Sequence, residues 1–162
     1  MRRWDDTIHE EHESLRAQAE DLRAVLAMSE AAPAQRQAAL AWILQGLWPA
    51  LEVHLQREEE IFLPALRRLP GDESRNIALL QEEHGVLQAV CQRLAERLAD
   101  PAPLRWSSIQ LVGGLLRQLI EDHEQHIERL VIDVLEFNLA PGRLAALARA
   151  FEAPRPVMMA AA

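Results

Sequence analysis

The chain has 162 residues and a formal net charge of −8, from 25 acidic and 17 basic side chains. That length is typical of one domain, and it is enough for a hydrophobic core that needs no disulfide or metal to hold it. The acidic balance excludes the basic surface by which proteins bind nucleic acids or anionic membranes. Ala, Leu, Glu, Gln and Arg dominate, and Tyr is absent, so the composition favours helices throughout.

Proline and glycine residues divide the sequence into helical segments. Five helices are expected, four long and one short: 5–30, 34–68, 72–99, 104–138 and 143–151. Pro49 and Pro64 fall inside the second helix. Each removes a backbone hydrogen bond, so we expect bends near 46–48 and near Glu60. The proline-rich segment 100–103 is expected to be a stiff connector.

Four long helices with short connectors predict an all-α fold, an up-down-up-down four-helix bundle with a short C-terminal fifth helix. We expect the bundle over 1–140, and the short helix with a flexible tail over 141–162. In the second and fourth helices, apolar residues recur every three or four positions and form a core stripe that also contains His54, Glu58 and His123. Burying an unpaired polar group costs about 1–3 kcal/mol, so these residues need partners, and a metal ion would serve.

The sequence carries no sign of export. No apolar run approaches the ~20 residues that span a bilayer, and 1–12 lacks the apolar stretch of a signal peptide. The single cysteine, Cys91, cannot form an internal disulfide and is expected to be a small buried core residue. We therefore expect a cytoplasmic protein.

Two halves of the chain resemble each other. The segment EEHESL around His12 resembles EEHGVL around His84, 72 residues later, and the segment that begins at His54 resembles the one at His123, 69 residues later. Each of these four histidines falls in a different predicted helix, among carboxylates. Such a pseudo-two-fold bundle suits two metal ions, each bound mainly by one half.

His54 and Glu58 are four residues apart, so they lie one above the other on a helix face and can bind one metal or bridge two. Imidazole and carboxylate ligands with open positions suit iron that handles dioxygen, whereas magnesium and calcium prefer oxygen ligands alone. A cysteine-rich zinc site is excluded because the chain has no second thiol. The Glu-x-x-His motif of ferritin-like enzymes is absent, because the residues three before His54, His84 and His123 are Leu51, Gln81 and Ile120.

The order of one histidine, then His-xxx-Glu, then one histidine, then a histidine followed by a carboxylate resembles the haemerythrin-like (HHE cation-binding) family over 4–138. The Trp4-Asp5 start is also similar to that family. The resemblance implies a four-helix bundle with two non-haem iron ions, bridged by carboxylates and an oxo or hydroxo group. Family members bind or sense dioxygen, or respond to iron, nitric oxide or peroxide.

The resemblance also implies metal ligands at particular positions, with Glu58 as a bridging carboxylate: His12, His54, Glu58, His84 and His123. The resemblance leaves open which residue supplies the last carboxylate ligand. Ile127 stands one turn after His123, where many family members have Glu, while Glu128 matches the His-xxxx-carboxylate spacing of the invertebrate oxygen carriers. A second histidine of the third helix would fall at Gln88, and His126 is a candidate replacement. We expect six protein ligands, or an asymmetric site with one labile position.

Several neighbouring residues have simpler interpretations. Glu59 and Glu60 are expected to face solvent, with a role beside the ligands left open for Glu59. His9 is expected to be exposed. Three tryptophans are expected to fill the core or one end of the bundle: Trp42, Trp48 and Trp106.

We predict a non-haem di-iron protein that binds or senses dioxygen or a related small oxidant, because histidine ligands that outnumber carboxylates favour binding over oxygenation. One alternative is a stress protein that removes peroxide or handles iron after nitric oxide damage, on the same site. Another is a regulatory helical module with a degenerate metal site, which Gln88 and Ile127 would favour. A protein partner or a second copy of the chain would then dock on 141–162.

Overall fold

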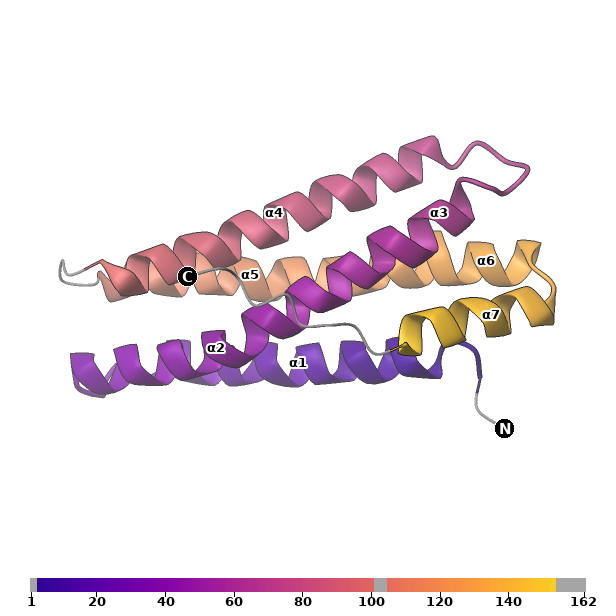
Figure 1. Ribbon diagram of the computed structural model, residues 1–162. Helices are drawn as coiled ribbons and strands as arrows, with labels where there is room; N and C mark the ends of the chain where they lie inside the picture. The colour runs from indigo at the N-terminus through magenta and orange to yellow at the C-terminus, as the bar shows by residue number, and fades with distance from the viewer. Residues whose placement is uncertain (1–2, 101–104, 154–162) are drawn as a thin grey trace.

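The computed structural model describes residues 3–100 and 105–153, and within them every regular element is a helix (Figure 1). The expected all-α fold is confirmed. Residues 101–103 of the predicted connector 100–103, and residues 154–162 of the predicted tail, lie outside the described residues. In chain order the elements are α1 (Asp6–Leu26), α2 (Pro33–Arg57), the π-helix η1 (Glu58–Phe62), α3 (Leu63–Leu66), α4 (Ser74–Ala99), α5 (Trp106–Ile127), the π-helix η2 (Glu128–Ile132), α6 (Asp133–Asn138) and α7 (Pro141–Glu152).

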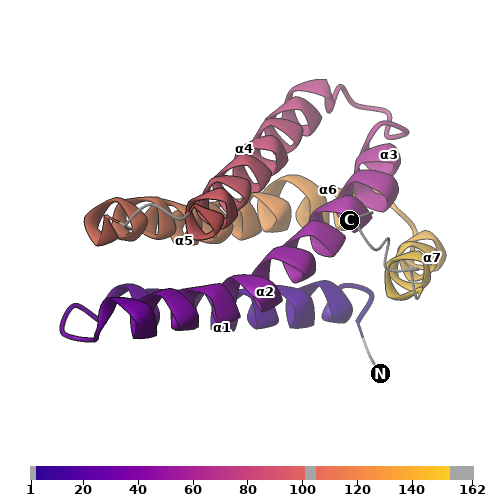
Figure 2. The same cartoon turned by 60° about the vertical axis from the view of Figure 1, so that its left-hand side comes forward.

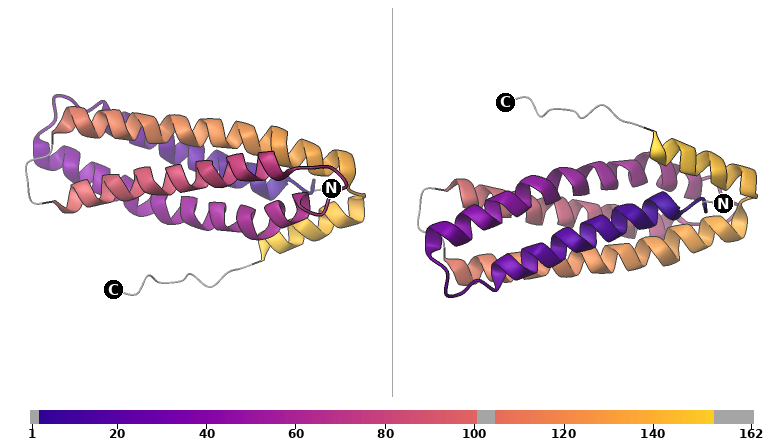
Figure 3. Two further views of the ribbon diagram at one scale, coloured as in Figure 1. Left: turned by 90° about the horizontal axis from the view of Figure 1, so that it is seen from above. Right: turned by 90° about the horizontal axis from the view of Figure 1, so that it is seen from below.

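Four long helical arms lie side by side: α1, α2 with η1 and α3, α4, and α5 with η2 and α6 (Figures 1 and 3). Consecutive arms run in opposite directions in Figure 1. The helix α1 packs against α2 and α5, and α4 packs against the same two helices. Each arm therefore contributes one face to a shared interior.

The first helix ends four residues earlier than the sequence predicts, at Leu26 rather than at residue 30. The next helix, α2, begins at Pro33. A residue before proline is pushed out of the helical region, and Ala32 is extended, with φ −58° and ψ 143°. Pro33 itself takes the first helical position, where its missing N–H leaves no bond unmade.

The prolines inside the second predicted helix act in two ways. The helix α2 continues through Pro49 and changes direction along its course (Figures 1 and 2). Just before Pro64 the backbone hydrogen bonds span five residues instead of four. The N–H of Leu63 donates to the carbonyl of Glu58. The second π-helix, in which Asp133 N–H donates to the carbonyl of Glu128, contains no proline and was not predicted.

The core consists of two apolar clusters, one on each side of a polar layer. Ile8, Ile61 and Ile127 belong to one cluster, while Leu15 and Leu51 belong to the other. The polar residues of the core stripes lie between them along each helix. Among the tryptophans, Trp48 and Trp106 pack against the core, but Trp42 is 71% exposed, so its expected place in the interior is wrong.

Candidate metal centre

The polar layer between the two clusters holds one histidine from each of four helices and a single carboxylate. All five residues are buried, with at most 3% of their surface exposed: His12 (α1), His54 (α2), Glu58 (η1), His84 (α4) and His123 (α5). Three of the histidines, His12, His84 and His123, have a buried apolar residue three or four positions away on either side, and His54 follows the buried Leu51 and precedes Glu58 on its stripe. The residues with the strongest sequence signal therefore meet at one place.

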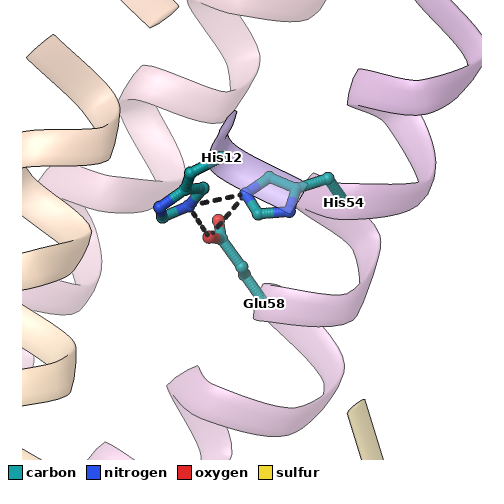
Figure 4. A group of neighbouring side chains, drawn as sticks. All are labelled: His12, His54 and Glu58. Carbon is teal, nitrogen blue, oxygen red and sulfur yellow. Dashed lines mark hydrogen bonds and ion pairs between the residues drawn. The ribbon is translucent and has the colours of Figure 1, made fainter. Parts of the chain in front are cut away.

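Two groups of ligand atoms share Glu58. In the first, His12 Nε2 and His54 Nε2 lie 3.1 Å apart, and Glu58 Oε1 lies 3.8 Å from the former and 3.0 Å from the latter (Figure 4). In the second, Glu58 Oε2 lies 3.2 Å from His84 Nε2 and 3.0 Å from His123 Nε2. Each group offers two imidazole nitrogens and one carboxylate oxygen to a cation.

These residues fit a metal ion. Transition-metal bonds to nitrogen and oxygen are about 2.0–2.2 Å long, which places neighbouring ligand atoms roughly 3 Å apart around the metal. The separations of ligand atoms within the groups are of that size. Glu58 Oε1 and His84 Nε2 are also buried without a hydrogen-bond partner among the described residues. Buried polar atoms are normally paired, and a cation between them would supply the missing partner.

Glutamates on neighbouring helices contact the outer nitrogens of three of these imidazoles. The Nδ1 of His54 lies 2.9 Å from Glu11 Oε2, and the Nδ1 of His84 lies 3.0 Å from Glu59 Oε1. The Nδ1 of His123 lies 3.4 Å from Glu83 Oε2. A carboxylate at Nδ1 favours the tautomer that carries its proton there, which leaves the Nε2 lone pair free for a cation. Both expectations for Glu59 hold, because its side chain is 44% exposed and also contacts the ligand candidate His84.

The charges of the layer shift the pKa values of its members. Burial lowers the pKa of His54, but the charge of Glu58 and the hydrogen bond with Glu11 outweigh burial and raise it to about 9. The pKa of His123 also rises to about 9, again against burial and mainly through Glu58. Burial dominates at His12 and lowers its pKa. A cation must therefore compete with protons for some of these nitrogens.

Glu58 itself is held in its ionised form. Burial raises the pKa of this carboxyl, yet the charges of His54 and His123 and hydrogen bonds with the surrounding imidazoles lower it well below its ordinary value of 4.5. A carboxylate that stays ionised at neutral pH, with both oxygens facing imidazole nitrogens, is suited to bridging two cations.

The helix α7 forms part of the wall of this centre, although the sequence suggests a separate docking element there. Phe151 is 1% exposed and stacks on Phe62, with ring centroids 5.0 Å apart. Its ring also meets the edge of His54, at 6.2 Å between centroids. Thr7 Oγ1 donates a 2.7 Å hydrogen bond to Glu152, which ties α7 to α1. Phe151 and the other residues of the two apolar clusters surround the centre with apolar side chains.

The other predicted ligands lie outside both groups of ligand atoms. The side chain of Glu128 is 46% exposed, and its Oε2 lies 3.9 Å from Nδ1 of the half-exposed His9. The side chain of His126 is 37% exposed, with Nδ1 2.5 Å from Glu83 Oε1. Gln88 is exposed and Ile127 is fully buried, so neither adds a polar atom to the centre.

Two further carboxyl groups are buried, although the sequence did not predict their burial. Asp5 is fully buried and bonded to Arg3 and His9. Glu124 is 6% exposed, and its Oε1 has no hydrogen-bond partner among the described residues. Such an unpaired atom costs about 1–3 kcal/mol. Burial raises the pKa of Glu124 to about 7, despite the opposing charge of Arg16.

Comparison with known proteins agrees with the resemblance in the sequence. Residues 5–130 match the sequence model of the family described as the Hemerythrin HHE cation binding domain. No curated protein and no solved structure matches the chain significantly. Within the described residues, no helix is long and apolar enough to cross a membrane.

Proposed function

Because the chain belongs to the Hemerythrin HHE cation binding domain family, we propose that it is a non-haem di-iron protein that binds or senses dioxygen or a related small oxidant. One observation carries the proposal: a single buried carboxylate, Glu58, faces two separate pairs of imidazoles. The family match supports cation binding, and the histidine-rich ligand set supports iron.

The residues of the centre have distinct roles in this proposal. His12 and His54 would hold one iron, His84 and His123 would hold the other, and Glu58 would serve both. Two irons held in this way, with coordination positions left open, supply the site where a small oxidant binds. The outer glutamates fix the imidazole orientations, and the apolar walls limit the entry of water. Four neutral donors against one carboxylate favour reversible binding over oxygenation.

The alternative of a degenerate, purely regulatory site receives less support. Gln88 and Ile127 do depart from the ligand pattern of the oxygen carriers, as the sequence indicates. The two groups around Glu58 are nevertheless each complete with three buried ligand atoms. In this proposal, metal binding therefore needs neither of the two departing positions.

The test is to load the protein anaerobically with ferrous iron, to measure iron per chain, and then to record the absorption spectrum as air is admitted. We expect two irons per chain and a new near-ultraviolet band of oxo-bridged ferric iron. His54→Ala should lose at least one iron, whereas His9→Gln, which changes a histidine outside both groups, should keep two. A wild-type protein that binds no iron would overturn the proposal, as would a His54→Ala variant with unchanged iron content.

A further inference from the structure

We propose that Glu124 is the second buried carboxylate ligand of the centre, and that it binds the cation held by His12 and His54. This inference rests on the proposed function and deepens it, because it assigns a ligand that the family pattern does not place. Glu124 directly follows His123 in α5, so on an ideal helix the two side chains point about 100° apart. It approaches the centre from a different side.

Glu124 is buried but not fixed. Its surface is 6% exposed, and Oε1 has no hydrogen-bond partner among the described residues. The nearest cation is Arg16, whose Nη1 lies 3.5 Å from Oε2, and whose own side chain is 53% exposed. A carboxylate held only by a loose ion pair is free to turn toward a stronger cation.

The surroundings of Glu124 place it beside the first group of ligand atoms. Arg16 lies in α1 one turn after His12, so Glu124 faces α1 close to that histidine. The ion pair with Arg16 places the Glu124 carboxyl against α1, beside the centre. The carboxyl therefore lies within electrostatic reach of the centre, on the side that His12 occupies.

The internal repeat gives an independent argument. At an offset of 69 residues, Glu58 corresponds to Ile127, and Leu55 corresponds to Glu124. All four are buried, with exposed fractions of 0%, 0%, 1% and 6% in that order. Each half thus buries one carboxylate and one apolar residue at these two corresponding positions. The apolar residue comes first in the first half, and the carboxylate comes first in the second half. The second half has kept a carboxylate near the centre, one residue after its histidine instead of four.

The chemistry of the first group has room for this ligand. His12, His54 and one oxygen of Glu58 make three ligand atoms, and iron in sites of two histidines and one carboxylate keeps further positions open. In the structure Glu124 lies outside both groups, so binding requires its side chain to turn from Arg16 toward the cation. Arg16 then acts as a positioning residue that holds Glu124 until the cation arrives.

The experiment is an anaerobic calorimetric titration with ferrous iron. It uses the full chain as the wild type, as Glu124→Gln and as Glu121→Gln. Glu121 is the matched control, because it lies one turn earlier in α5 and pairs with Arg117 instead of facing the centre. We expect Glu124→Gln to weaken one of the two binding events at least tenfold and to leave the other unchanged. Glu121→Gln should behave as the wild type. Arg16→Gln should bind as tightly as the wild type or more tightly.

Thermal unfolding without iron separates a ligand from a structural role. Glu124→Gln should unfold at the wild-type temperature or above it, because the change removes a buried charge. Two unchanged binding events in Glu124→Gln would overturn this inference and leave the proposed function intact, and so would an Arg16→Gln variant with weaker binding. A wild type that binds no iron would overturn both.

Discussion

At the scale of single residues, the centre depends on side chains that never touch the cation themselves. Three of the four imidazoles have a glutamate at Nδ1, and each glutamate comes from a different helix than the imidazole it contacts. Such contacts fix the ring orientation and raise the basicity of the ligand nitrogen. The arms of the bundle are thus linked through the ligands as well as through apolar packing.

Glu59 allows this role to be tested without harm to the core, because its side chain is 44% exposed while its Oε1 lies 3.0 Å from His84 Nδ1. We expect Glu59→Ala to weaken binding of one ferrous ion by about 10-fold or more, the usual effect of losing such a contact. Glu60→Ala is the control, since the neighbouring Glu60 accepts a hydrogen bond from Gln56 at the surface. Calorimetric titration with ferrous iron measures the affinities of both variants. Equal affinities of Glu59→Ala and Glu60→Ala would contradict the prediction.

The residues that the sequence predicts well are those on a core stripe. His54 and Glu58 are four positions apart, about 40° on an ideal helix, so a stripe that buries one buries both. Glu128 is five positions after His123, about 140° around the helix, and its side chain is half exposed. Glu124 was missed because a residue next to a stripe position normally faces a neighbouring helix or solvent, whereas Glu124 is buried where α5 packs against α1, beside Arg16.

At the scale of helices, the widened turns follow the ligands. The π-helix η1 begins at Glu58, four residues after His54, and η2 begins at Glu128, five residues after His123. Single π turns inside α-helices are frequent at functional sites. Proline signalled only the first of them in the sequence. The second has no local signal in the sequence, and its residues Val131 and Ile132 are buried, with 0% and 1% exposed.

This comparison predicts that Pro64 accompanies the first π turn without causing it. We expect Pro64→Ala to change the free energy of unfolding by less than about 1 kcal/mol and to leave iron binding at two per chain. The reason is that Phe62 and Leu63 are buried, with 0% and 1% exposed, and this burial fixes the register of the turn. Denaturant unfolding and iron analysis measure both quantities. A lost iron would show that the proline is required.

At the scale of the whole molecule, the buried charges make stability depend on pH. The pKa values of His54 and His123 rise from 6.5 to about 9 in the folded protein, so their contribution to stability is complete below pH 6.5 and is lost as the pH rises through 9. Glu124, whose pKa is raised from 4.5 to about 7, acts with the same sign, because its proton is bound more tightly in the fold. Glu58, with its lowered pKa, opposes them only under acid.

We therefore expect the iron-free protein to unfold at a temperature at least about 5 °C lower at pH 9 than at pH 6.5. Bound metal should reverse this trend, because cations displace the same imidazole protons and bind more tightly as the pH rises. Thermal unfolding at pH 6.5, 7.5 and 9, with and without zinc as a redox-inert probe, measures both effects. Glu58→Gln removes the charge that raises both histidine pKa values, so its iron-free stability should vary less with pH. An iron-free wild type that is more stable at pH 9 would show that these imidazoles bind no extra protons in the fold.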